Sequence, residues 1–159
     1  MRKLHTHFLV ARNIPEKLSK ILVCAGAEAP VSETMTLGGE WIANAGAKVG
    51  LLHVVPVEKD MAATKNKTDL PSDGATEMQD PVLERASRQL REAGVKDIIP
   101  HIRRGLVVDE VMRELFDGGY ELLVVGAHYQ PGQDRWQGTL FDDVTDQLLN
   151  RSTCSVLII

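Results

Sequence analysis

The sequence lacks the features that mark several protein classes. Only two of its 159 residues are cysteines, Cys24 and Cys154, which is too few for a metal-ligand pattern. No apolar run approaches the roughly 20 residues that a membrane-spanning helix needs. His5 and His7 interrupt the only candidate for a secretory signal. The net charge of -4 leaves no basic excess for binding nucleic acid non-specifically. We therefore expect a cytoplasmic protein with no membrane segment and no nucleic-acid partner.

Familiar catalytic motifs are missing as well. The sequence contains no nucleophile elbow, no P-loop and no dinucleotide fingerprint, although Gly26 and Gly126 each follow an apolar run. His5 and His7 have the spacing of two metal ligands but no third ligand nearby. The two cysteines stand in strand-like runs, which favours small buried hydrophobes over a redox pair. We predict no catalytic residue and no metal site.

What the sequence does contain is a regular alternation of short apolar runs and amphipathic segments. The apolar runs predict buried strands, and the segments between them have helical periodicity. Alternation of this kind predicts an α/β fold, a single open five-stranded parallel sheet with helices on both faces. The expected strands cover residues 20–25, 48–56, 95–102, 120–126 and 155–159, and the expected helices lie between them.

Local signals predict where the helices begin and what they bury. Ser32 is a plausible N-cap for a helix to about Ala47, and Gly38 and Gly39 suggest close packing of one helix face on the sheet. Asp80 followed by Pro81 predicts a second N-cap. In the following helices the expected apolar positions are Leu83, Ala86 and Leu90, then Val108, Val111, Met112, Leu115 and Phe116, and finally Val144, Leu148 and Leu149. We expect a long loop over residues 58–79, and a turn at 103–105 after the third strand.

The candidate binding site is the end of the sheet where the strands finish. In parallel sheets, ligands bind beyond the carboxyl ends, where the strand order reverses. The segment 126–139 starts at such an end and finishes with Gly138 and Thr139 before a helix, whose N-terminus can hold an anion. The alternative is that Gly138 and Thr139 only make a turn and cap that helix. Trp136, within the segment, either covers the pocket, contacts a partner or packs back on the loop.

Other polar residues have a functional and a structural interpretation. His53 lies inside an apolar strand, which favours a packed residue over a base; His101 is in another strand and His128 in the candidate loop. The acidic pairs 109–110 and 142–143 lie near helix N-termini, where they stabilise the helix dipole. Arg103 and Arg104 either meet an anion or are solvated.

The ordered combination of segments from Lys20 to Ile159 resembles the universal stress protein family, within the adenine-nucleotide alpha-hydrolase-like α/β group. Residues 20–23, 51–56 and 121–126 resemble its first, second and fourth strands, and residues 151–159 resemble its ending. The resemblance implies a small, dimeric α/β protein that acts in stress responses. Some members of the family bind ATP and others do not.

The resemblance also implies site residues, and here the chain departs from the ATP-binding pattern. Binders carry an Asp where this chain has Gly26, and a second loop glycine where it has Tyr129. The stretch from Gly126 to Gly138 is one residue short, whereas Gly138 and Thr139 match. The nucleotide- or anion-binding positions implied by the family are Gly26, Val54, Val125, Gly126, Gly138 and Thr139. We expect a degenerate loop that binds ATP, or another adenine nucleotide, weakly or not at all.

The N-terminal residues resemble the closing strand of a preceding domain of the same family. This similarity covers residues 7–12, and residues 13–19 are like the linker of tandem members. We divide the chain into an extension or remnant, 1–19, and a universal stress protein-like domain, 20–159. We expect residues 8–10 to form a strand. We also expect a homodimer, or a tandem domain pair, through the apolar C-terminal strand 156–159 at the sheet edge.

The function expected from sequence is a regulatory, stress-response binding module rather than an enzyme. Two alternatives stay open. One is an ATP-binding or nucleotide-hydrolysing member of the same fold group, for which only His128 and Asp134 offer polar side chains near the phosphate site. The other is a cytosolic regulatory domain of a larger protein such as a transporter or kinase.

Overall fold

The computed structural model describes residues 7–26, 31–57, 80–126 and 143–159. Strands and helices alternate along this part of the chain, as the apolar periodicity predicted. The elements are β1 (Phe8–Val10), β2 (Lys20–Cys24), α1 (Val31–Ala45), β3 (Lys48–Pro56), α2 (Pro81–Glu92), β4 (Ile98–Gly105), α3 (Val107–Gly118), β5 (Leu122–Val125), α4 (Asp143–Arg151) and β6 (Ser155–Ile158).

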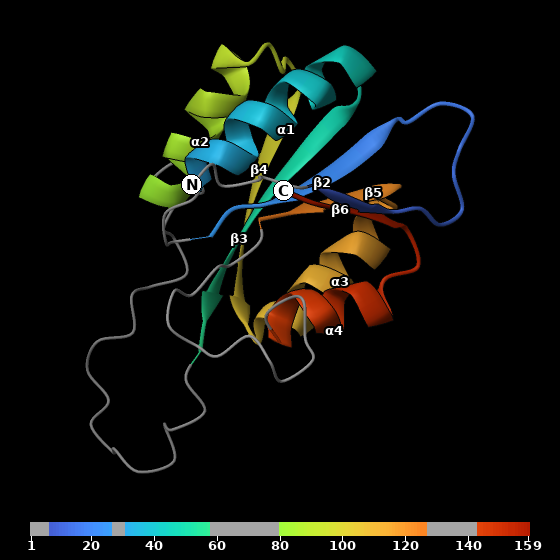
Figure 1. The fold of residues 1–159 in the computed structure, drawn as a ribbon. Helices are drawn as coiled ribbons and strands as arrows, with labels where there is room; N and C mark the ends of the chain where they lie inside the picture. Colours follow the sequence, from blue (N-terminus) through green and yellow to red (C-terminus); the bar gives the residue numbers. More distant parts are fainter. Residues whose placement is uncertain (1–6, 27–30, 58–79, 127–142) are drawn as a thin grey trace, which may run out of the picture.

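The strands form one six-stranded sheet in the order β1-β6-β5-β2-β3-β4. Strands β2 to β6 are parallel, and β1 alone is antiparallel to its neighbour. Helices α1 and α2 cover one face, and α3 and α4 cover the other (Figure 1). The α/β fold with helices on both faces is therefore confirmed, as is the strand at residues 8–10.

Two apolar clusters hold the three layers together. Successive side chains of a strand point to opposite faces, so Ile21 and Val23 belong to the cluster under α1 and α2, while Leu22 belongs to the cluster under α3 and α4. Each of these three side chains is almost completely buried. Strands buried on both faces read as continuous apolar runs, which is why the sequence revealed them.

Both glycines of α1 allow close packing, as predicted, but against different neighbours. Gly38 packs against the residue that follows the last strand of the sheet, and Gly39 packs against α2. A Cβ on Gly38 would lie 2.7 Å from Cδ1 of Ile159, the residue after β6. A Cβ on Gly39 would lie 2.6 Å from Cβ of Ala93, at the end of α2. Ser32 lies inside α1, which begins at Val31, so its prediction as the N-cap was wrong.

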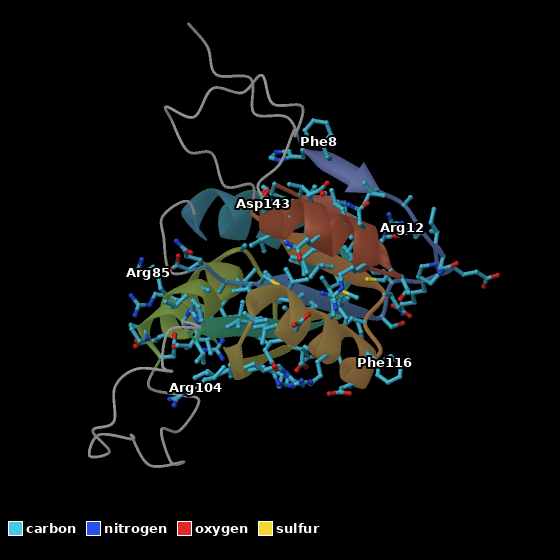
Figure 2. The ribbon with its side chains drawn as sticks, turned by 90° about the horizontal axis from the view of Figure 1, so that it is seen from below. Phe8, Arg12, Arg85, Arg104, Phe116 and Asp143 are labelled. Atoms are coloured by element: carbon cyan, nitrogen blue, oxygen red, sulfur yellow. The ribbon has the colours of Figure 1, made fainter. Side chains whose placement is uncertain are left out.

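One other predicted boundary and two predicted core positions were wrong. Arg103, Arg104 and Gly105 belong to β4 instead of forming a turn, because β4 stays paired with β3 as far as Gly105. On α3, Phe116 is 88% exposed rather than buried (Figure 2). The helix is rotated so that Glu110 and Glu114 face the sheet, where they meet Arg103. Val144 of α4 is also exposed, whereas Leu148 is buried as predicted and Thr145 is buried beside it.

The C-terminal strand does not lie at the sheet edge, contrary to the premise of the predicted dimer contact. Strand β1 covers it, with Phe8 opposite Ile158 and Val10 opposite Val156. The turn after β1 is fastened by Arg12, whose guanidinium donates to the carbonyl oxygens of Leu149 and Ser152 at 2.6 and 2.7 Å. The outermost strands are thus β1 and β4. In the part of the chain that the structure describes, no helix has the length and apolar character to cross a membrane.

Candidate functional site

The strand order reverses between β5 and β2, and this point defines the candidate site. From β2 the chain crosses to β3 on one side, whereas β5 and β6 lie on the other. The paired strands β2 and β5 end at Cys24 and Val125, and the chain leaves them through Gly26 and Gly126. Both glycines therefore follow the carboxyl ends of adjacent strands, which is where ligands bind in parallel sheets.

Four of the six predicted site residues fall within the described chain. Gly26 is exposed, and a Cβ added to it would meet no atom within 4 Å. Gly126 is half-buried. Val54 and Val125 are buried in the cluster under α3 and α4, on strands separated by β2. Gly138 and Thr139 lie outside the described residues, as do Tyr129, His128, Asp134 and Trp136.

The described part of this site is formed mainly by main-chain groups. The side chains of Val54 and Val125 are enclosed in the core, and at the strand ends the chain presents two glycines. A glycine lets a ligand approach the backbone closely. This arrangement suits hydrogen bonding of a ligand by peptide groups more than acid–base chemistry.

The nearest ionisable side chains on β3 and α2 bind each other. Nδ1 of His53 lies 2.9 Å from Oδ2 of Asp80, and the other carboxylate oxygen, Oδ1, accepts from the backbone N–H groups of Val82 and Leu83. His53 is buried with its ring satisfied, which confirms the packed interpretation, and Asp80 is the N-cap of α2 as predicted. Sequence reasoning missed the bond between them because 27 residues separate the two.

Burial and hydrogen bonding act in opposite directions on the pKa of Asp80. Burial alone would raise it, but the N–H of Leu83, the ring of His53 and the N–H of Val82 together hold the pKa below its ordinary value. The carboxylate is therefore kept charged as a cap and does not serve as a proton donor.

Cys24 ends β2 next to the candidate site, and its surroundings disfavour the thiolate form. Burial raises the pKa of its thiol to about 12, so the reactive thiolate is suppressed at neutral pH. Both cysteines are unpaired, and Cys154 is buried. The described residues contain no group of three or more His, Cys, Asp and Glu side chains that could hold a metal ion.

Arg103, one of the two arginines considered for an anion, is already neutralised by carboxylates. Its Nε lies 2.7 Å from Oε2 of Glu114, and Nη2 lies 3.2 Å from Oδ2 of Asp117. Glu110 adds a contact of 3.7 Å. The spacing of Glu110, Glu114 and Asp117 along one helix face was the available signal, but it did not reveal which strand residue they meet.

Comparison with known proteins gives a consistent result. The model of the universal stress protein family matches residues 17–159. A search of curated proteins found no match. Among solved structures, a universal stress protein in complex with cAMP shares 21% sequence identity at a TM-score of 0.66, covering 91% of this chain and 98% of that one.

Two further solved structures agree in fold. Universal stress protein UspA from Lactobacillus plantarum shares 18% identity at a TM-score of 0.63, covering 91% of this chain and 99% of that one. The universal stress protein from Archaeoglobus fulgidus in complex with dAMP shares 14% identity at 0.62, covering 89% and 97%. With a family match over most of its length and the matching sheet and helices, the chain belongs to the universal stress protein family.

Proposed function

We propose that this protein is a cytoplasmic stress-response regulatory module that binds an adenine nucleotide weakly and does not act as an enzyme. The observation that carries the proposal is the pair of glycines, Gly26 and Gly126, at the carboxyl ends of adjacent strands at the point of order reversal. Two structures of similar fold hold cAMP and dAMP. This supports an adenine nucleotide as the ligand class.

Weak binding follows from what Gly26 lacks. A carboxylate at this position accepts hydrogen bonds from a ribose or an adenine amino group, whereas Gly26 offers only its backbone. Hydrogen bonds that involve a charged group contribute about 1.5–3 kcal/mol. A ligand held by peptide groups alone is therefore bound at least about tenfold more weakly.

Restoring the carboxylate tests this proposal. Among the described residues, no atom lies within 4 Å of a Cβ on Gly26, so a side chain can begin there, and Gly26→Ala is the matched control for Gly26→Asp. Titration calorimetry with Mg-ATP, AMP and cAMP should show weak or undetectable binding to the parent and to Gly26→Ala. Binding to Gly26→Asp should be at least about tenfold tighter. Micromolar binding by the parent that Gly138→Val abolishes would overturn the proposal.

We further propose that two copies associate through the sheet edge formed by β1, the strand that covers β6. Strand β1 is three residues long, and its Phe8 and Leu9 are 43% and 58% exposed (Figure 2). An exposed apolar edge strand invites pairing with a second chain. Light scattering should give a dimer for the parent and a monomer for Leu9→Arg. The control Ile14→Arg, at a position 75% exposed but outside the strand, should stay dimeric. A monomeric parent would refute this contact.

Our proposed domain division is residues 1–19 as an extension and 20–159 as the folding unit. The apolar clusters draw their buried residues from Ile21 onward. We expect the chain 20–159 to unfold cooperatively, with lower stability than the full chain because the outer edge of β6 is uncovered. A shortened chain without a cooperative transition would show that β1 belongs to the same folding unit.

A further inference from the structure

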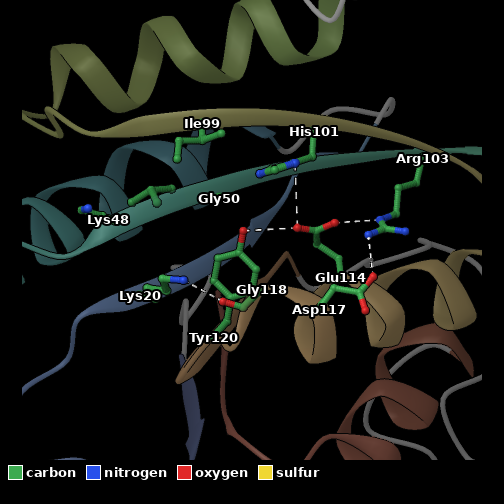
Figure 3. A pocket seen from close by; sticks show the side chains of 11 residues that line it. Lys20, Lys48, Gly50, Ile99, His101, Arg103, Glu114, Asp117, Gly118 and Tyr120 are labelled. Carbon is green, nitrogen blue, oxygen red and sulfur yellow. Dashed lines mark hydrogen bonds and ion pairs between the residues drawn. The ribbon is translucent and has the colours of Figure 1, made fainter.

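A groove of about 390 Å³ lies on the α3 face of the sheet (Figure 3). Its lining includes Lys20 and Lys48, the first residues of β2 and β3, together with Gly118 from the last turn of α3. The groove therefore opens at the amino ends of the strands. The candidate nucleotide site, at Gly26 and Gly126, lies at the opposite ends.

The floor of the groove is formed where the Tyr120 ring packs on a glycine. Gly50 has no side chain, and the hydroxyl oxygen of Tyr120 lies 2.1 Å from the position of an ideal Cβ, so the Tyr120 ring fills the space over Gly50 and lines the groove. Because β4 is an edge strand, its side chains close the groove only in part, and Ile99 remains 54% exposed. The groove therefore has an apolar part, formed by Ile99 and the Tyr120 ring, beside charged side chains.

At the α3 side of the groove, Arg103 is already paired with carboxylates. Glu114 is 5% exposed; its Oε2 accepts from Arg103 at 2.7 Å and its Oε1 from the hydroxyl of Tyr120 at 3.3 Å. Arg103 also contacts Asp117. Both carboxylates share one guanidinium, so this end has no unmatched positive charge to offer a ligand.

The end of the groove at Lys20 and Lys48 differs from the α3 side in how its charges are paired. Lys20 and Lys48 are register partners on neighbouring strands, and both line the groove. Nζ of Lys20 donates to the carbonyl oxygen of Gly118 at 2.9 Å, but no carboxylate among the described residues pairs with either lysine side chain. Like charges directly opposite each other on one sheet face repel. An oxyanion bound at this end of the groove reduces this repulsion.

The ring of His101 completes the lining between the two ends. Its Nδ1 faces Oε1 of Glu114 at 3.8 Å, and Figure 3 shows the ring extending from β4 over β3, toward Gly50. An apolar group in the groove would therefore meet this ring, Ile99 and Tyr120. The volume falls within the range of about 300–1,000 Å³ that is usual for small-molecule sites.

We propose that this groove is a second ligand site, for a small organic anion with one carboxylate or phosphate head on an apolar body. The head binds at Lys20 and Lys48, and the body lies against Ile99 and the Tyr120 ring. Charge complementarity selects the head, because Arg103 is already paired with carboxylates whereas no carboxylate among the described residues pairs with either lysine side chain. This site is independent of the nucleotide site, at the other end of the same strands.

Phenyl phosphate and benzoate are suitable probes, because they share an apolar ring and differ in their head group. Amide NMR spectra of the full chain, recorded with each probe at millimolar concentration, should shift at Gly50, Ile99 and Tyr120 and leave Gly26 and Gly126 unchanged. Whichever probe binds more tightly identifies the preferred head. Benzyl alcohol, which has the ring without the charge, should produce no such shifts.

Two exposed lysines provide a matched pair of variants. Lys48→Gln should weaken binding of the preferred probe about tenfold, since it removes a charged hydrogen-bond donor. Lys96→Gln, which makes the same charge change outside the groove lining, should leave the affinity unchanged. The proposal is overturned if neither probe shifts the groove residues, if benzyl alcohol binds as tightly, or if both variants weaken binding equally. None of these outcomes depends on whether a nucleotide binds.

Discussion

Nδ1 of His53 lies 2.9 Å from one oxygen of Asp80, and the other oxygen of this carboxylate caps helix α2. One side chain thus joins the middle of the sheet to the start of a helix. The contact also fixes where α2 begins. This pair should therefore matter for stability more than a surface cap does.

Replacing Asp80 by alanine should destabilise the protein. The substitution removes the acceptor for two backbone N–H groups, which costs about 1–2 kcal/mol for a helix cap, and leaves the buried ring of His53 without its partner. Asp80→Asn keeps an acceptor oxygen and should lose less than half as much. Urea unfolding measures both. Equal losses in the two variants would show that the charge matters and the cap does not.

The same carboxylate predicts a dependence on acid pH. Because the pKa of Asp80 is lowered in the folded state, its contribution to stability is present above the ordinary value of 3.8 and is lost as the pH falls through the folded value. The stability difference between the parent and Asp80→Asn should therefore be smaller at pH near 3 than at pH near 5. A difference that stays constant over this interval would contradict the lowered pKa.

Gly50 should tolerate no side chain, whereas Gly26 should. A Cβ on Gly50 would stand 2.1 Å from the hydroxyl oxygen of Tyr120, but one on Gly26 meets nothing within 4 Å. Gly50→Ala should cost about 1–3 kcal/mol, as overpacking usually does. Gly26→Ala should leave the midpoint of thermal unfolding nearly unchanged. Similar stability of the two variants would mean that the Tyr120 ring moves aside without cost.

Tyr120 should ionise late in an alkaline titration. Burial, together with the charge and hydrogen bond of Glu114, raises its pKa to about 12. Its contribution to stability is therefore complete below the ordinary value of 10 and is lost as the pH rises toward 12. Tyrosinate absorbance should show a late phase that Tyr120→Phe removes. The other tyrosine, Tyr129, provides the internal comparison.

Arg12 should control how firmly β1 covers β6. Its guanidinium donates to two carbonyl oxygens, and its backbone N–H donates to Oγ of Ser155 at 2.9 Å. Arg12→Ala should destabilise the strand pair by about 1–3 kcal/mol and accelerate amide exchange at 156–158. Lys17→Ala, an exposed change in the segment before β2, should not. Unchanged exchange in both variants would show that β1 is held by its strand pairing alone.

Local patterns determined most of the architecture. Continuous apolar runs predicted the buried strands because a central parallel strand is covered on both faces. Asp80 followed by Pro81 predicted a helix start because the cap depends on the next three residues only. The same reasoning misplaced the end of β4, since an edge strand accepts polar residues: Arg104 is exposed, and Arg103 is paired with the buried Glu114 of α3.

The tertiary structure decided what local patterns could not. The contacts of Arg103 with Glu114, of His53 with Asp80 and of β1 with β6 join residues far apart in the chain. Hydrophobic periodicity predicts that a helix has an apolar face, but it does not predict the orientation of the helix about its own axis when it packs on the sheet. On α3 that rotation buries two glutamates beside an arginine and exposes Phe116. The sequence by itself thus determined the elements and their order, and only packing decided which side chains meet, because a partner's position depends on the whole sheet register.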